Sequence, residues 1–139
     1  MKKILLIMIG LSVGLMADFT RDANTAIVTD SVTGLQWQDD TTPSKSWQGA
    51  IDYCEALTLG GKSDWRLPNI NELTSLVDDT VYDPSISNVF QHTISNLYWS
   101  STTNAGGTST AWIVYFGNGS QDSSTKTNSS YVRCVRAGQ

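Results

Sequence analysis

The sequence contains one histidine, His92, and only two cysteines, and these shortages exclude several kinds of site. Zinc sites draw on sets of His and Cys ligands that this chain does not supply. His92 lacks the nucleophile elbow or local signature that accompanies a Ser-His-Asp site. No Cys-x-x-Cys redox motif occurs. We therefore expect no catalytic residues, and a small hydrolase or modifying enzyme is the least favoured alternative.

Basic residues are also scarce. Nine Lys and Arg stand against thirteen Asp and Glu, which gives a formal net charge of −4. Lys2 and Lys3 lie in an N-terminal segment discussed next, and without them the charge is near −6. An acidic protein is a poor partner for nucleic acid or sulfated glycans, because both are polyanions. We expect no nucleic-acid partner.

No apolar run reaches the length of about 20 residues that a membrane-spanning helix needs. Lys2-Lys3, an apolar run over residues 4–15 and the small residue Ala17 instead follow the pattern of a secretory signal peptide, residues 1–17. A retained N-terminal anchor is the alternative. We expect export to the periplasm or the cell surface, no membrane span after cleavage, and one mature domain of residues 18–139.

The two cysteines, Cys54 and Cys134, are 80 positions apart. In an oxidising compartment an even number of cysteines predicts a disulfide, and closure of such a loop contributes about 4 kcal/mol. Cys54 falls on an apolar helical stripe, so its thiol points into the core and not toward a reactive site. Two separately buried thiols are the alternative.

Strands are expected toward both chain ends and helices in the middle. Alternating or continuous apolar residues predict strands at 26–28, 35–38, 97–101, 111–116 and 131–136, the first two as a hairpin. Apolar spacing over 47–57 predicts a helix that starts at Ser44 or Ser46 and is ended by Gly60-Gly61. Residues 18–24, 102–110 and 120–130 are polar and are interpreted as a lead-in and two loops.

Residues 64–73 combine a conformationally restricted proline with a helix N-cap. Pro68 fixes its own φ, Asn69 can cap a short helix over 70–77, and Glu72 can return the capping bond. In one interpretation Trp65 fills the core and Arg66 pairs with Asp64 or Glu72. In the other, Arg66 anchors an anionic ligand in a cleft. The structural motif comprises Asp64, Trp65, Arg66, Pro68, Asn69 and Glu72.

Two tryptophans next to polar loops are candidate ligand-binding residues. Trp99 and Trp112 offer flat apolar faces on which a sugar ring can stack, with Asn104, Asn118 and Asp122 as candidate hydrogen-bonding neighbours. Packing of both tryptophans in the core is the alternative, because tryptophan is highly buried on average.

Three aspartates are the only candidates for a metal site. Asp78, Asp79 and Asp83 could bind calcium, which takes several oxygen ligands. Their spacing matches no EF-hand loop, so surface acids are the alternative. Apart from calcium we expect no cofactor.

Five motifs in a fixed order resemble the C-terminal domain of the Legionella collagen-like adhesin, a family described as a domain of unknown function. The motifs are Thr33–Gln38, Asp64–Asn69 with Glu72–Leu73, Tyr98–Ser101, Ala111–Trp112 with Phe116, and Val132–Arg136, and the resemblance runs from about Ala26 to Arg136. It implies a bacterial, exported protein with a fold like that of C-type lectins and formylglycine-generating enzymes. In C-type lectins a disulfide ties the first helix to the last strand, and Cys54 and Cys134 occupy those places.

The chain also departs from these relatives. The adhesin binds sulfated polysaccharides and trimerises on a collagen stalk, whereas this chain is acidic and has no collagen repeat. The Glu-Pro-Asn motif by which C-type lectins hold sugar and calcium is absent, and Leu67-Pro68-Asn69 shares only Pro-Asn with it. The catalytic cysteine pair of the formylglycine enzymes has no counterpart if Cys54 and Cys134 are bridged.

Together these features predict an α+β, C-type-lectin-like domain with two short helices, long irregular loops and a small, mainly antiparallel sheet that pairs the chain ends. The expected function is an adhesion-type binding module for a glycan or a surface partner. A structural or assembly protein of the cell envelope is the alternative.

Overall fold

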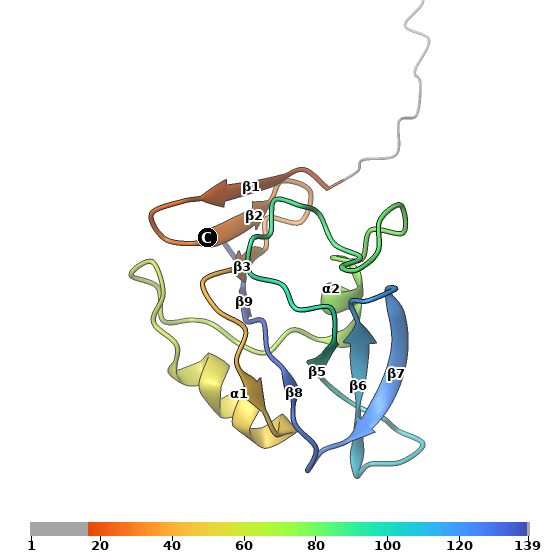
Figure 1. Cartoon of the computed structure of the whole chain (residues 1–139). Coiled ribbons are helices and arrows are strands. Elements are labelled where there is room, and N and C mark those ends of the chain that lie inside the picture. Colours follow the sequence, from red (N-terminus) through yellow and green to blue (C-terminus); the bar gives the residue numbers. More distant parts are fainter. Residues whose placement is uncertain (1–16, 139) are drawn as a thin grey trace, which may run out of the picture.

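Two sheets with two helices beside them make up the computed structural model, which describes residues 17–138 (Figure 1). The strands are β1 Phe19–Asp22, β2 Ile27–Asp30, β3 Gln36–Gln38, β4 Ser44–Lys45, β5 Leu97–Thr103, β6 Thr110–Tyr115, β7 Ser120–Thr125, β8 Ser130–Tyr131 and β9 Val135–Arg136. The helices are α1 Trp47–Ala56 and α2 Ile70–Thr74. The α+β class is therefore confirmed. The finer likeness to C-type lectins stays a prediction.

The predicted N-terminal segment lies outside the described residues. The signal peptide of residues 1–17 and the alternative of a retained anchor both concern the chain before Ala17. Within residues 17–138, neither helix has the length and apolar character needed to cross a membrane.

The first sheet has the strand order β1-β2-β3-β9. The predicted hairpin is confirmed, with Val28 paired to Trp37, and β9 joins β3, so the two ends of the domain do meet in one sheet. The prediction of a lead-in over residues 18–24 was wrong, because this stretch contains β1. β1 is a polar edge strand, and only Phe19 is apolar; its ring packs edge-on against Phe90 with centroids 5.3 Å apart.

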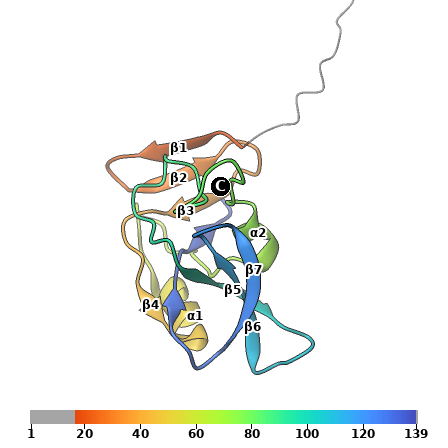
Figure 2. The same cartoon turned by 45° about the vertical axis from the view of Figure 1, so that its right-hand side comes forward.

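The second sheet has the order β4-β8-β5-β6-β7 and is antiparallel except where β5 meets β8 (Figure 2). The prediction of one polar loop over residues 120–130 was wrong, because β7 pairs with all of β6. β7 lies at the sheet edge and is almost entirely hydroxyl and amide residues. It therefore needs only its backbone to join the sheet and carries no apolar signal.

The last predicted strand, 131–136, is split between the two sheets. Residues 130–131 form β8 in the second sheet, and residues 135–136 form β9 in the first. The expected alternation still holds, because Val132 and Cys134 face one core cluster while Val135 faces the other.

The first helix, α1, begins after Ser46, whose side-chain oxygen accepts a hydrogen bond from the Gly49 N–H, as predicted. Its apolar stripe faces the core, and Ala50 and Cys54 are fully buried. The helix ends at Ala56, so the prediction that Gly60-Gly61 stops it was wrong. The two glycines form the turn of a separate small loop closed by Leu59 and Lys62.

The second helix, α2, is shorter than predicted. Asn69 and Glu72 form the predicted capping box. The helix stops at Thr74, not Val77, because the next hydrogen bonds span only three residues and Val77 then pairs with Ile86 as an isolated bridge. The long connection that follows, residues 75–96, reaches the first sheet before it enters β5 (Figure 1).

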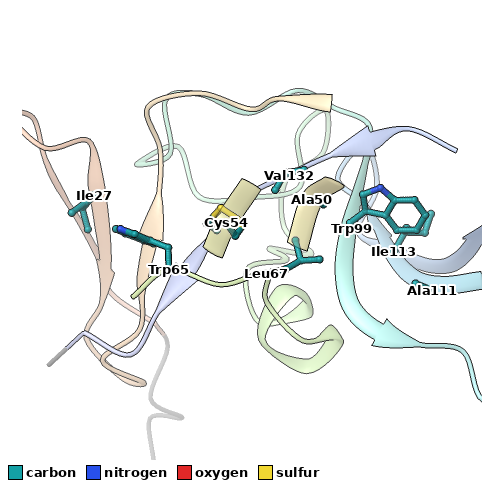
Figure 3. Packing of buried hydrophobic residues seen from close by; sticks show 10 residues of the cluster. Ile27, Ala50, Cys54, Trp65, Leu67, Trp99, Ala111, Ile113 and Val132 are labelled. Atoms are coloured by element: carbon teal, nitrogen blue, oxygen red, sulfur yellow. A yellow bond between two sulfur atoms is a disulfide. The ribbon is translucent and has the colours of Figure 1, made fainter. Parts of the chain in front are cut away.

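Two apolar clusters form the core, one on each side of β5 and β6. The first surrounds the Cys54–Cys134 disulfide and comprises Ile27, Ala50, Cys54, Trp65, Leu67, Trp99, Ala111, Ile113, Val132 and Cys134 (Figure 3). The second comprises Val28, Trp37, Leu73, Leu76, Ile86, Phe90, Tyr98, Val114, Phe116 and Val135. The predicted disulfide is thus present, with both cysteines fully buried.

Candidate functional site

In the segment of residues 64–69, which leads into α2, Arg66 forms an ion pair within the fold. Arg66 Nη1 and Nη2 donate to the two carboxylate oxygens of Glu72 at 2.6 and 2.7 Å. The hydrogen bond and charge of Arg66 lower the pKa of Glu72 below its ordinary value, and Glu72 in turn raises the pKa of Arg66. Because Nη1 and Nη2 already bind a carboxylate, the charge of Arg66 is compensated within the fold, which disfavours its use as an anion anchor.

The same segment is hydrogen-bonded to β9, the last strand. The N–H and C=O groups of Arg66 pair with those of Val135, both at 2.9 Å. Arg136 donates from Nε to the carboxylate of Asp64 at 2.7 Å, and this bond lowers the pKa of Asp64. Trp65 is buried in the first cluster. Each large side chain of the motif therefore has a contact within the fold.

A buried polar cluster that the sequence analysis missed joins the first sheet to the 75–96 connection. Arg133 donates to Asp39 Oδ1 at 3.0 Å and to the main-chain oxygen of Gln38 at 2.6 Å, and its guanidinium lies 4.8 Å from the Phe90 ring centroid. Asp39 also accepts from Arg21 at 2.6 Å. Asp39 is fully buried and Arg133 nearly so. This cluster holds the 75–96 connection in place, because the N–H groups of residues 91 and 92 also donate to Asp39.

Trp99 cannot serve as an open platform for a sugar. It is 0% exposed, packs in the first cluster, and donates from its indole nitrogen to the Lys45 oxygen at 2.8 Å. The prediction that it belongs to a ligand site was wrong, because β5 is an interior strand and Trp99 faces the first core cluster. The alternative of core packing holds for this tryptophan.

Trp112 lies on the opposite face of the second sheet and is only partly buried. Alternation along β6 places it with Val114, which is covered by α2, while Ile113 faces the first cluster. The N-terminal end of α2 lies nearby, because the Ile70 N–H donates to Thr102 Oγ1 at 3.0 Å across β5. α2 has only five residues, and Trp112 beside it remains partly exposed.

Hydroxyl side chains surround Trp112 on this face. Ser123 is its direct cross-strand partner on β7, and Thr125 is the next residue of β7 on that side. Gln121, two residues before Ser123, faces the same side, because its side-chain nitrogen donates to Thr74 Oγ1 of α2 at 2.6 Å. Within residues 17–138 the Trp112 indole N–H makes no hydrogen bond. The sequence analysis missed Thr102, Ser123 and Thr125, because recognising them required β7 and the register of its pairing.

The other predicted ligand residues do not gather around Trp112. Asn104 and Asn118 lie in the turns at opposite ends of β6, where their side-chain oxygens accept from the N–H groups of Gly106 and Ser120. Asp122 is paired with Ile113 and therefore belongs to the other face of β7. The predicted grouping of these three with Trp112 was wrong, because strand alternation and strand length separate them.

The acidic residues of the long connection do not converge. Asp78 accepts hydrogen bonds from the N–H and hydroxyl of Thr80, which lower the pKa of Asp78. Among residues 17–138 no group of three or more His, Cys, Asp or Glu side chains is arranged to hold a metal ion. Calcium binding at Asp78, Asp79 and Asp83 therefore stays a prediction without a geometric basis in this part of the chain.

His92 contributes its backbone and not its ring. Its N–H donates to Asp39 and its oxygen accepts from Arg133 at 2.7 Å. The side chain is exposed, and His92 lines none of the three surface hollows described for this fold. A Ser-His-Asp arrangement has no support in this geometry.

The comparison with protein families gives one result. A family model described as the Lcl C-terminal domain matches residues 26–136, which is most of the chain. No curated protein sequence matches it.

Proposed function

The chain belongs to the Lcl C-terminal domain family, and on this premise we propose that it is a binding module that holds an uncharged glycan against Trp112. The observation that carries the proposal is the partly exposed Trp112 on the open end of a sheet face, with Thr102, Ser123 and Thr125 on the same face. An aromatic ring can take the apolar side of a sugar, while hydroxyl groups bond to its edges.

The charges near this face favour a neutral ligand. Arg66 is the cation closest in sequence to α2, and its Nη1 and Nη2 already donate to Glu72. A sulfate or carboxylate on the sugar would compete with Glu72 for Arg66, whereas a hydroxyl-rich neutral sugar would not. The net charge of −4 also disfavours an anionic ligand.

The proposal includes export from the cytoplasm to the periplasm or cell surface. It is supported by the basic and apolar start of the sequence and by the Cys54–Cys134 disulfide, since stable disulfides are typical of oxidising compartments. A role in adhesion is part of the same proposal and depends on where the protein is displayed.

A glycan array tests the proposal directly. The purified, disulfide-bonded protein is applied to neutral and sulfated glycans, with and without calcium, beside the Trp112→Ala and Tyr82→Ala variants. We expect binding to one class of neutral glycan that Trp112→Ala loses at least tenfold, because the stacking surface is gone. Tyr82→Ala removes an exposed aromatic ring elsewhere and should leave the binding unchanged.

A second variant guards against a folding artefact. Trp112→Phe keeps an aromatic ring and should retain part of the affinity, and all variants should stay folded, with thermal midpoints lowered by no more than about 10 °C. Binding that requires sulfate, or that survives Trp112→Ala in a folded protein, would contradict the proposal.

A further inference from the structure

A second surface stands apart from Trp112, at the other end of β6. Tyr82, in the connection from α2 to β5, is 79% exposed, and Val81 before it is 41% exposed. They are two of the four large apolar side chains in residues 17–138 that are strongly exposed. Large aromatic side chains left in solvent are typical of interaction surfaces.

The segment that carries Tyr82 is held rigidly from both sides. The Asp83 N–H donates to the Gly117 oxygen at 2.9 Å, and the Ser85 N–H donates to the Phe116 oxygen at 2.7 Å. The Asp78 N–H donates back to the Ser85 oxygen at 3.0 Å, which closes the loop on itself. Tyr82 is therefore presented on a fixed base, and little conformational entropy would be lost when a partner binds there.

An open groove lies beside this loop. It has a volume of about 540 Å³, and its apolar lining comes from Val81, Pro84, Ile86 and Phe90. Ile86 and Phe90 belong to the second core cluster, so the floor of the groove is firm. Polar groups in the wall come from Asp78, Ser87, Asn88, Gln91 and Thr93, so the groove is partly apolar and partly polar.

The loop beside the groove is acidic: Asp78 lines the groove, and Asp79 and Asp83 lie next to lining residues in the sequence. Arg133 contacts Phe90 and Thr93 of the lining, but it is buried and paired with Asp39. No Lys or Arg occurs in the sequence between Arg66 and Lys126. The ion pairs formed within residues 17–138 use Asp39, Asp64 and Glu72, and none involves Asp78, Asp79 or Asp83. A binding partner for a partly apolar groove beside unpaired acidic side chains is one that brings its own positive charge.

We propose that the groove beside Tyr82 docks an extended peptide segment of a partner protein in which basic and apolar residues alternate. The apolar side chains lie against Ile86 and Phe90. The Lys or Arg side chains, whose stems are themselves apolar, place their charges near Asp79 and Asp83 and over the exposed ring of Tyr82. This surface is independent of the glycan proposal, because it uses none of the residues around Trp112.

The test is an NMR titration of the isotope-labelled protein with three short synthetic peptides. Lysine alternates with leucine in the first, glutamate with leucine in the second, and lysine with glycine in the third. We expect the first alone to shift the amide signals of Val81, Tyr82, Ile86 and Phe90. Its affinity should fall as salt rises, because the attraction is partly between exposed charges.

Two matched double variants separate local from overall charge. Asp79→Asn with Asp83→Asn keeps the shape of both side chains, and asparagine tolerates the positive φ of 53° at Asp83. We expect it to weaken the lysine–leucine peptide about three- to tenfold. Asp52→Asn with Glu55→Gln removes the same charge from the exposed side of α1 and should have little effect. Tyr82→Ala should also weaken binding, and Trp112→Ala should not.

Several outcomes would overturn this proposal. They are equal binding of the glutamate–leucine or lysine–glycine peptide, shifts centred on α1 or on Trp112, and an equal loss with the α1 control. Concentration-dependent self-association that occupies the same residues would show that a second copy of the chain, and not a basic peptide, fills the groove. A negative glycan array with a positive titration would remove the glycan proposal and leave this one standing.

Discussion

Arg133 and Asp39, 94 positions apart in sequence, form a 3.0 Å ion pair closed to solvent. Each also has other partners, so the pair sits in a fully bonded polar cluster. Two buried charges are tolerated together, but either alone is costly.

Asp39→Asn should therefore lower the free energy of unfolding by about 3–5 kcal/mol, because Arg133 is left buried without its counter-charge. Chemical denaturation measures the loss. Glu72→Gln, which breaks the more exposed pair with Arg66, is the control and should cost about 1 kcal/mol or less. Equal losses of unfolding free energy in the two variants would show that the buried pair contributes no more to stability than the exposed one.

Stability should fall in acid. Burial raises the pKa of Asp39, but hydrogen bonds from Gln91, Arg21 and His92 and the charge of Arg133 outweigh it, and the pKa lies below its ordinary value of 3.8. A group whose pKa is lower in the folded state stabilises it fully above 3.8, and that contribution is lost as the pH falls toward the folded-state pKa. Unfolding free energies measured between neutral pH and pH 2 should decline mainly below about pH 4. The decline should be shallower in Asp39→Asn, and an identical pH profile would argue against this role.

Loss of the disulfide should cost about 4 kcal/mol, because it closes a loop of 80 positions. The double variant Cys54→Ala, Cys134→Ala supplies the measurement by denaturation. Both cysteines are fully buried, so a mild reductant should act on the native protein only as fast as it unfolds. Rapid reduction of the folded protein without loss of structure would contradict this.

The two sheet tryptophans should differ sharply in stability. Trp99→Ala opens a cavity in the first cluster and leaves the Lys45 oxygen without its donor, and we expect a loss of about 3–5 kcal/mol. Trp112→Ala removes a partly exposed ring and should cost about 1–2 kcal/mol. Thermal and chemical denaturation of the two variants side by side checks the difference, and a larger cost for Trp112 would reverse the assignment of faces.

Gly119→Ala should destabilise more than Gly34→Ala. Both glycines have positive φ, of 81° and 74°, so both substitutions carry about 1 kcal/mol of backbone strain. At Gly119 the added carbon would also come within 2.5 Å of Val77 Cγ1, whereas at Gly34 nothing lies within 4 Å. Denaturation midpoints of the two variants isolate the steric contribution, and equal shifts would show that Val77 moves aside at little cost.

Local patterns predicted much of this fold. The hairpin of β2 and β3, the helix α1, the capping box at Asn69 and the disulfide each depend on residues close in sequence or on residue type. The edge strands β1 and β7 were missed for a physical reason. Such strands hold their place by backbone hydrogen bonds and need no apolar face.

The candidate site was harder to predict than the fold. Trp99 and Trp112 look alike in sequence, and only the pairing register shows that one faces a closed layer and the other an open one. Asp39 and Arg133 carry no local signature, because their partnership exists only after distant segments meet. Local residue patterns do not reveal contacts between segments that are far apart in the sequence.

The split of residues 130–136 between two sheets has a consequence for the cooperativity of unfolding. This short stretch supplies Tyr131 to one sheet, Val135 to the other, Arg133 to the interior ion pair and Cys134 to the disulfide. Loss of this segment would therefore release both sheets, the interior ion pair and the disulfide together. We expect the two sheets to unfold in one cooperative transition and not one after the other.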